Sequence, residues 1–157
     1  MPGEFYVENK AEKVSLETVE SSLAGLNTKA DAIKSRTDNL AGETPWQGAT
    51  TADWQTVEAN VVSIGAAGIR NKIHDLTLSI HNLVGTQIRV RLYKKVNGTE
   101  RKVYDQSFDA TSDPVGLPVI NGTWAIHDVL RVTLQSNNAT DNGKVVDYDY
   151  MLEKMLS

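Results

Sequence analysis

The sequence predicts an α+β chain organised by segment, with N-terminal coiled-coil helices followed by an antiparallel β-sandwich of jelly-roll type. In the first third of the chain, apolar residues recur at alternating steps of three and four, which is the spacing of a coiled-coil seam. From Ile69 onward the apolar period changes to two, and turn residues separate short runs. That second pattern is typical of antiparallel strands in a sandwich or barrel.

The seam of the first helix runs without a break from Leu16 to Leu40, and charged residues fill most of the positions between its members. A stripe this narrow cannot be buried by a helix standing alone, so we expect copies of the chain to associate through it. The predicted seam residues of this helix are Leu16, Val19, Leu23, Leu26, Ala30, Ile33, Thr37 and Leu40.

The helical stem is predicted to begin at residue 13, after a loose N-terminal arm over residues 1–12. Ser15 is a partial N-cap, because the glutamate of a full capping box would stand at position 18 and here stands at 17. Gly25 inside the helix costs about 1 kcal/mol relative to alanine. The coiled coil is therefore expected to be marginal without the domain that follows it.

A helix stop and a second, shorter seam complete the predicted stem. Gly42 and Pro45 follow the last seam residue, where such residues commonly end a helix, and residues 41–51 are predicted to form a loop. The next apolar residues again step three, four, three, which predicts a helix of about three turns. The stem therefore covers residues 13–67. The members of this second seam are Trp54, Val57, Val61 and Ile64.

Residues 68–157 are predicted to form the β-sandwich, with six or seven strands. Asn97-Gly98 lies between two strand patterns and predicts a hairpin with a type I′ turn, in which both central residues need positive φ. A strand over residues 118–125 is expected to be broken at Asn121-Gly122. The other predicted strands lie near residues 76–80, 88–96, 99–108, 130–135 and 146–152.

Composition excludes several classes of protein. The chain has 157 residues, a formal net charge of -4 and no cysteine, so a disulfide-stapled fold and cysteine-ligated metal sites are excluded. Its positive residues are scattered, which argues against a nucleic-acid partner. No apolar run approaches the roughly 18 residues that a bilayer span needs, so we expect no membrane partner.

The titratable residues do not form a recognisable catalytic or metal-binding motif. His74 and His81 are an odd number of residues apart and would face opposite sides of a regular strand. Asp147 and Asp149 share one face of the last predicted strand, as general acid/base or calcium-binding carboxylates sometimes do. No loop has the spacing of calcium ligands, so we interpret this pair as the wet face of a half-buried strand. The sequence therefore predicts no enzyme, no catalytic residue, no metal and no cofactor.

Basic residues concentrate on the predicted hairpin. Such a hairpin suits an acidic partner surface, or cross-strand pairing with Glu100 and Asp105. The negative net charge of the chain opposes nucleic-acid binding as its main role. The basic residues are Arg89, Arg91, Lys94, Lys95, Arg101 and Lys102.

Two stretches resemble known sequences. Ala32-Ile-Lys-Ser-Arg-Thr-Asp-Asn-Leu40 resembles the "IKAKTDNLP" segment of predicted coiled-coil proteins from tailed phages and prophages, with Ala41 in place of the usual proline. The second set resembles the C-terminal domain of uncharacterised phage-associated proteins with a similar helical front. It comprises Lys72-Ile-His-Asp-Leu76, Arg91-Leu-Tyr93, Asn97-Gly-Thr-Glu-Arg-Lys-Val-Tyr-Asp-Gln106, Asp113-Pro-Val-Gly-Leu117, Ile126-His-Asp-Val-Leu-Arg131 and Asp141-Asn-Gly-Lys-Val-Val-Asp-Tyr-Asp-Tyr150.

This resemblance implies a virion structural protein. A self-associating helical stem that carries a compact β-domain suits oligomeric display on an icosahedral shell, so we expect the capsid surface rather than the tail. We expect an oligomeric decoration or head-fibre protein that contacts the major capsid protein or other virion proteins. A trimer is expected because phage fibres and decoration proteins are usually built so. The alternative is a tail-fibre or receptor-binding module that recognises a host surface glycan or protein, with Trp124, Tyr148 or Tyr150 stacking on sugar rings.

Overall fold

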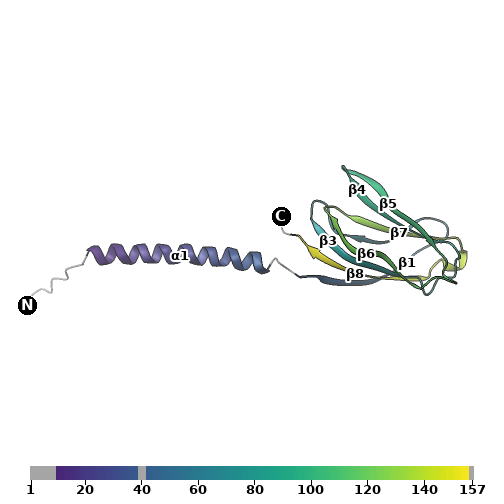
Figure 1. Ribbon diagram of the computed structural model, residues 1–157, viewed down its shortest axis with the longest axis horizontal. Helices are drawn as coiled ribbons and strands as arrows, with labels where there is room; N and C mark the ends of the chain where they lie inside the picture. Colours follow the sequence, from purple (N-terminus) through teal and green to yellow (C-terminus); the bar gives the residue numbers. More distant parts are fainter. Residues whose placement is uncertain (1–9, 39–41, 156–157) are drawn as a thin grey trace, which may run out of the picture. The chain divides into compact units, whose positions relative to one another are not determined.

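The computed structural model contains one helix followed by eight strands and a short 3-10 turn in the part of the chain that it describes, residues 10–38 and 42–155 (Figure 1). Side chains are described for residues 16–37 and 42–155. The chain divides into two compact units, Met1–Leu40 and Ala41–Ser157. Each unit is treated by itself below.

The helix α1 spans Lys10–Asp38 and confirms the predicted first helix. It begins three residues before the predicted start, so Ser15 lies inside it and is not an N-cap. The helix also runs through Gly25 without interruption. Thr28 and Thr37 turn their hydroxyls onto the carbonyl oxygens of Ala24 and Ile33, at 3.0 and 2.9 Å, which satisfies these polar groups within the helix.

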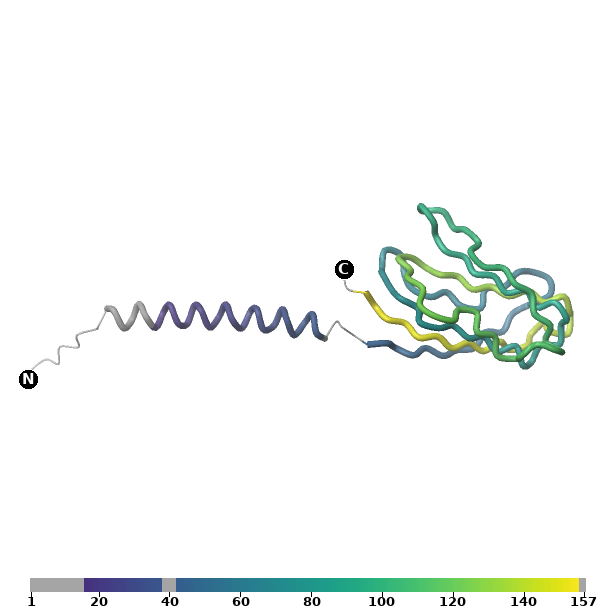
Figure 2. Tube along the Cα trace, in the orientation of Figure 1, coloured from purple at the N-terminus to yellow at the C-terminus, as the bar shows by residue number. Residues whose placement is uncertain are grey.

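The eight strands form two four-stranded antiparallel sheets that face each other (Figures 1 and 2). The first sheet has the order β1-β8-β3-β6 and the second the order β2-β7-β4-β5. Neighbours in each sheet are therefore mostly far apart in sequence. The strands are β1 (Thr44–Thr51), β2 (Ala59–Ile64), β3 (Asn71–Ser79), β4 (Ile88–Val96), β5 (Thr99–Phe108), β6 (Gly116–Ile126), β7 (Leu130–Ser136) and β8 (Val145–Lys154).

The prediction of a second helix is wrong, because three of its four seam residues lie in the core of the sandwich. Trp54 and Ile64 are fully buried and Val61 is 3% exposed, all in the core between the sheets, whereas Val57 is 55% exposed. Val61 and Ile64 are three apart and would face opposite sides of a regular strand. A register shift between Asn60 and Val62 where β2 pairs with β7 allows both to reach the core.

The segment predicted as a loop and second helix belongs to the β-unit from its start. Residues 44–51 form β1, which pairs with β8 along its whole length, from Thr44 opposite Leu152 to Thr51 opposite Val145. Gly65 and Gly68, at φ +87° and +74°, lie in the connection between β2 and β3. The sandwich unit thus includes residues 41–67, which the sequence assigned to the stem.

The core between the sheets consists almost entirely of aliphatic side chains that alternate along the strands. Each fully buried leucine or isoleucine contributes about 1.5–3 kcal/mol relative to an exposed one. The largest buried side chain, Trp54, also donates from Nε1 to the Lys144 carbonyl oxygen at 2.7 Å. The fully buried aliphatic residues include Ile64, Ile73, Leu76, Leu78, Ile80, Ile88, Leu92, Leu117, Ile120, Ile126 and Leu130.

The predicted hairpin is confirmed, and the predicted break in a later strand is a bulge. Asn97 and Gly98 connect β4 to β5 with φ of 50° and 74°, as a type I′ turn requires. β6 continues through Asn121 and Gly122, where Gly122 has φ +115°. Its pairing with β3 shifts register in this region, between Ile73 and Asp75. Positive φ at a glycine therefore marks an irregularity inside the strand, not its end.

Three connections meet at one end of the sandwich, and Asp141 joins two of them directly. Its buried carboxylate accepts from the backbone N–H of Val84 and Gly85 at 2.8 and 3.1 Å, and from Ser136 Oγ at 2.5 Å. The β7–β8 connection, which contains the 3-10 turn η1 (Ala139–Asp141), is thereby joined to the β3–β4 connection. Trp54 O also accepts from Ser136 N at 2.8 Å, which brings in the β1–β2 connection.

We predict that Trp54→Ala destabilises the β-unit by about 3–5 kcal/mol, because it removes the largest core side chain and one buried hydrogen bond. Val57→Ala, in the same short segment but exposed, should change stability by less than about 0.5 kcal/mol. Chemical unfolding of the full chain, followed by circular dichroism, measures both. If Trp54→Ala left the unfolding midpoint unchanged, this side chain would not belong to the sandwich core.

Candidate functional site

The first candidate surface is the apolar stripe on α1. Its large members remain more than half exposed: Leu16 and Val19 at 61%, Leu23 at 57%, Leu26 at 62% and Ile33 at 64%. Ala30 and Thr37 on the same stripe are also exposed, and Leu40 lies outside the described residues. Few monomeric proteins leave such a regular apolar line in water, so the stripe is a candidate interface.

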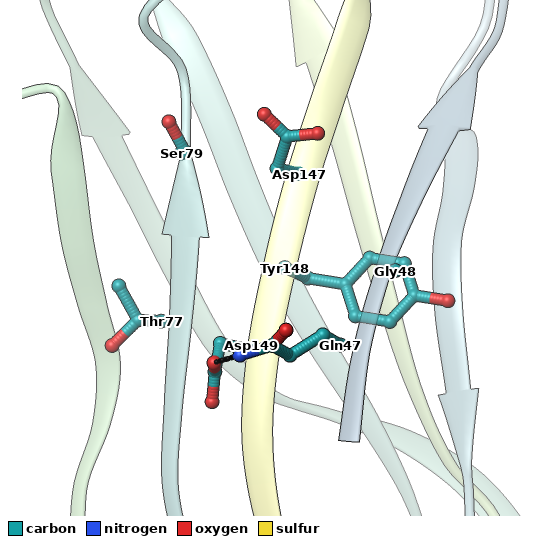
Figure 3. A pocket seen from close by; sticks show the side chains of 7 residues that line it. All are labelled: Gln47, Gly48, Thr77, Ser79, Asp147, Tyr148 and Asp149. Atoms are coloured by element: carbon teal, nitrogen blue, oxygen red, sulfur yellow. Dashed lines mark hydrogen bonds between the residues drawn. The ribbon is translucent and has the colours of Figure 1, made fainter. Parts of the chain in front are cut away.

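The second candidate surface is a shallow hollow on the outer face of the sheet β1-β8-β3-β6. Asp147 and Asp149 project from β8, between Thr77 and Ser79 of β3 and Gln47 of β1 (Figure 3). They share one face, as predicted, because Val146 and Tyr150 of the same strand point into the core. We name this the aspartate hollow; it has a volume of about 330 Å³ and is lined by Gln47, Gly48, Thr77, Ser79, Asp147, Tyr148 and Asp149.

The side chains of the aspartate hollow are held by neighbours in adjacent strands. Gln47 Nε2 donates to Asp149 Oδ2 at 2.9 Å, and His81 Nδ1 lies 3.7 Å from Asp147 Oδ2. A Cβ at Gly48 would overlap both Cζ and Oη of Tyr148, so a larger residue at this position of β1 would require the ring to move. The hollow combines two carboxylates with a single lining aromatic ring.

The third candidate surface is the outer face of the sheet β2-β7-β4-β5, where an ionic cluster is unusually well buried. The Arg91 side chain is only 9% exposed although its neighbours Val90 and Leu92 point into the core. Arg91 Nη1 donates to Glu58 Oε2 at 2.7 Å, and Thr133 Oγ1 donates to Glu58 Oε1 at 2.5 Å. Glu58 therefore joins a guanidinium of β4 and a hydroxyl of β7 on this face of the sheet.

Two opposing effects determine the pKa of the Glu58 carboxyl. Burial by itself raises the pKa of this carboxyl. Hydrogen bonds from Thr133 and Tyr93, with the positive charges of Arg91 and Arg131, outweigh burial and bring the pKa below its ordinary value. Burial and the hydrogen bond to Glu58 likewise raise the pKa of the Tyr93 phenol. The carboxylate form of Glu58 is therefore the one that the fold requires.

The charges of the β4–β5 hairpin are paired within the protein. Arg89 forms two bonds to Asp105, from Nε to Oδ1 at 2.6 Å and from Nη2 to Oδ2 at 2.8 Å, and Lys102 also pairs with this carboxylate. Hydrogen bonds from Arg89 and Lys102 lower the pKa of Asp105 far below its usual range. The cross-strand pairing predicted for Asp105 is thus confirmed.

The remaining hairpin charges pair with other strands and connections. Glu100 pairs with Arg131 of β7, at 3.0 and 2.7 Å, and not with a hairpin neighbour. The Arg131 guanidinium also lies 4.3 Å from the centre of the Tyr93 ring. Lys95 lies 3.0 Å from Asp128. Most basic residues of the hairpin therefore face a carboxylate, although Arg89 and Lys102 share one and Lys94 donates to the carbonyl oxygen of Ala125.

A second hollow of about 330 Å³ opens beside this cluster, toward the end of the sandwich that holds Asp141. We name it the amide hollow, because glutamine and asparagine side chains dominate its wall. The sequence pattern does not predict this hollow. Of its lining residues, only Arg89 and Arg91 are candidate functional residues in the sequence, as members of the basic hairpin. Its lining residues are Gln55, Gln87, Arg89, Arg91, Ser107, Gln135, Ser136 and Asn137.

The histidines have ordinary polar partners. His74 Nε2 lies 2.9 Å from Glu153 Oε2 and 3.5 Å from Glu43 Oε1. His81 lies beyond the end of β3, with Nδ1 2.9 Å from Ser79 Oγ, so the two-face argument from a regular strand does not apply to it. Among the described side chains, no group of three or more histidine and carboxylate residues is arranged to hold a metal ion.

The aromatic residues proposed to stack on sugars are mostly core residues. Tyr150 is 7% exposed, and Trp124 and Tyr148 pack against the core. Among the described side chains, the exposed aromatic one is Trp46, at 50%, and its ring is parallel to that of Tyr150 with centroids 6.3 Å apart. Trp46 falls in the predicted loop over residues 41–51, because the sequence pattern does not predict β1.

The fold and these surfaces define an α+β chain whose second unit is a two-sheet antiparallel sandwich with polar hollows on both outer faces. Comparison of the chain with protein-family models gave no match, and neither did comparison with curated proteins. In the described residues, no helix is both long enough and apolar enough to cross a bilayer.

We predict that the stability of the β-unit depends on pH through the ionisation of Asp105. Its pKa is lower in the folded state than in the unfolded chain, so it stabilises the fold above about pH 4, and this contribution is lost as the pH falls further. Asp105→Asn should therefore be less stable than the wild type at pH 7, and the difference should shrink below pH 4. Thermal unfolding of both proteins between pH 7 and pH 2 measures this difference in stability.

Val57→Ala provides the control, because this side chain is exposed and uncharged. Its difference from the wild type should change little over the same pH range, since no titratable group is altered. A difference for Asp105→Asn that stayed constant from pH 7 to pH 2 would contradict the ionic account of Asp105.

Proposed function

We propose that this protein is a virion structural protein of a tailed phage, an oligomer that decorates the capsid or forms a head fibre. The proposal rests on the exposed apolar stripe of α1, because a stripe with this spacing is normally buried against a partner helix. The resemblance of residues 32–40 and of the β-unit to phage proteins supports the virion assignment. The work proposed for the protein is mechanical: it binds the shell and stabilises it or displays the sandwich.

The stripe favours self-association through a coiled coil. Its members Leu16, Leu23 and Ala30 alternate with Val19, Leu26 and Ile33 at steps of three and four. This spacing keeps all of them facing a partner when helices wind around each other. α1 is about 43 Å long at 1.5 Å per residue, which provides four heptads. The mixture of leucine, valine and isoleucine does not select an oligomer number, and the trimer is proposed from the resemblance.

We interpret the sandwich as a jelly roll. Its strand order, β1-β8-β3-β6 over β2-β7-β4-β5, is the order expected when two Greek keys wrap eight strands into two sheets. Jelly rolls occur in viral capsid and lectin domains. This supports a place on a virus particle as well as recognition of a surface ligand, but a fold alone does not decide between them.

The capsid contact is proposed to involve polar surfaces of the sandwich. Several of the hairpin charges are paired internally, among them Arg89 with Asp105 and Lys95 with Asp128, so only part of the positive charge of the hairpin is available to attract an acidic shell. Complementary hydrogen bonding at a fixed register suits such a surface better than simple charge attraction.

The alternative function, a receptor-binding module for a host glycan or protein, has its own supporting observations. Trp46 exposes half of its surface, and two polar hollows open on the outer faces of the sandwich. Glycan sites commonly combine such polar groups with aromatic rings. A glycan hydrolase is less well supported, because Asp147 and Asp149 lie in an open hollow with one lining ring, not in an aromatic cleft.

We predict that Leu23→Asp with Leu26→Asp abolishes the oligomer. Two carboxylates in each copy would enter the apolar seam, at a cost of several kcal/mol per buried charge. Sedimentation should show the mass of one chain, while circular dichroism retains the β-sandwich signal. Ser22→Asp, between seam positions on the same helix, is the control and should leave the mass unchanged. An oligomer that survives the double substitution would refute the seam.

We also predict that antibody labelling of intact particles locates the protein on the capsid at a fixed copy number. Added protein should bind expanded shells lacking it and raise their resistance to heat. The receptor-binding alternative predicts instead labelling at the tail, and inhibition of infection by free protein. Label found on the tail alone would reject the capsid proposal in favour of that alternative.

A further inference from the structure

The amide hollow has features of a built binding site. Its wall includes Gln55, Gln87 and Gln135, which come from three separate segments: two connections and strand β7. The backbone N–H of Gln55 donates to Asn142 Oδ1 at 2.8 Å, and that of Gln87 donates to Asn137 Oδ1 at 3.2 Å. The main chain that carries these amides is therefore fixed before any ligand arrives.

The floor of the hollow is also fixed. Arg91, buried against Glu58, donates from Nη1 and Nη2 to Gln135 Oε1 at 3.4 and 3.3 Å. This orients the Gln135 amide so that its oxygen faces the guanidinium, and its NH₂ group is left to donate elsewhere. A group oriented in advance loses little conformational entropy when it binds a ligand.

The charge balance of the hollow selects against an ionic ligand. The Arg89 guanidinium already forms two short bonds to Asp105, and Arg91 is paired with Glu58. A sulfate or carboxylate would have to compete with Asp105 and Glu58 for these two guanidinium groups. A cation would meet two guanidinium groups. The groups that remain are amides and the Ser107 hydroxyl, which are neutral.

We infer that the amide hollow binds a neutral saccharide. Sugar hydroxyls both donate and accept hydrogen bonds, and primary amides do the same, so Gln55, Gln87 and Gln135 match vicinal hydroxyls without a charged partner. The volume of about 330 Å³ lies at the small end of ligand sites and admits one or two sugar rings.

The expected binding to one copy is weak. The Tyr93 ring on the same sheet face is covered by Arg131, and no aromatic residue lines the hollow among the described side chains, so no ring is available for stacking there. A dissociation constant on the order of 1 mM is expected for a monosaccharide. If the chain is the oligomer proposed above, several copies facing one surface raise the effective affinity roughly 100-fold or more. The binding of one sugar to one copy does not depend on that oligomer.

Saturation-transfer-difference NMR on the full chain tests the inference. The probes are methyl glycosides of neutral hexoses, deoxyhexoses and N-acetylhexosamines, each added singly at millimolar concentration, with inorganic sulfate as a competitor. We expect transfer to at least one neutral glycoside and no competition from sulfate. Gln87→Ala and Gln135→Ala should each weaken this binding by roughly tenfold, since each removes hydrogen bonds to the sugar.

Gln47→Ala is the matched control, because it removes a glutamine from the aspartate hollow on the opposite sheet. It should leave binding unchanged. The inference is overturned if no neutral glycoside receives saturation, if sulfate displaces the sugar, or if neither Gln87→Ala nor Gln135→Ala weakens the binding. Transfer that is lost only in Gln47→Ala would assign the sugar to the aspartate hollow, and would equally overturn it. None of these outcomes bears on the α1 seam, whose test is the sedimentation mass.

Discussion

Burial of the two facing apolar sides of the sandwich positions every surface on the β-unit. Leucine, isoleucine and valine from all strands except β1 and β5 contribute buried side chains, and Trp54 fills the space near the connections. Because alternate residues point inward, the others are forced outward in regular rows. Asp147 and Asp149 on one sheet, and Arg89 and Arg91 on the other, form such rows. Their geometry is a consequence of the core.

Polar side chains on the outer face of the sheet β2-β7-β4-β5 are held in place by several hydrogen bonds and ion pairs. Isolated surface ion pairs contribute little to stability, about 0–1 kcal/mol. Here, however, Glu58 is bonded by both Arg91 and Thr133, and the buried guanidinium would keep only its longer contact with Asp105, 3.7 Å from Nε to Oδ1, if Glu58 were removed. Such a network fixes side-chain positions more than it adds stability. Fixed polar groups beside an open hollow are the basis of the inferred saccharide site.

The helix and the sandwich have different roles in the proposed function. The helix presents an exposed apolar stripe, through which we propose that copies of the chain associate, whereas the sandwich completes its own core and presents polar surfaces. Weak contacts on each sandwich would become useful in such an oligomer, because the second contact is made at a high local concentration. This coupling would serve the proposed capsid decoration and the alternative receptor binding alike.

The sequence by itself determined the helix, the hairpin at Asn97-Gly98 and the outward position of Asp147 and Asp149, because these depend on local periodicity and turn chemistry. It did not determine β1, β2 or the role of Trp54. The spacing of Trp54, Val57, Val61 and Ile64 matches a helix, and only the bulge in β2 lets Val61 and Ile64 reach a common core. The Glu58–Arg91 pair and the amide hollow were likewise decided by tertiary structure. Their members are separated by tens of residues and meet only because β2, β7 and β4 are neighbours in one sheet.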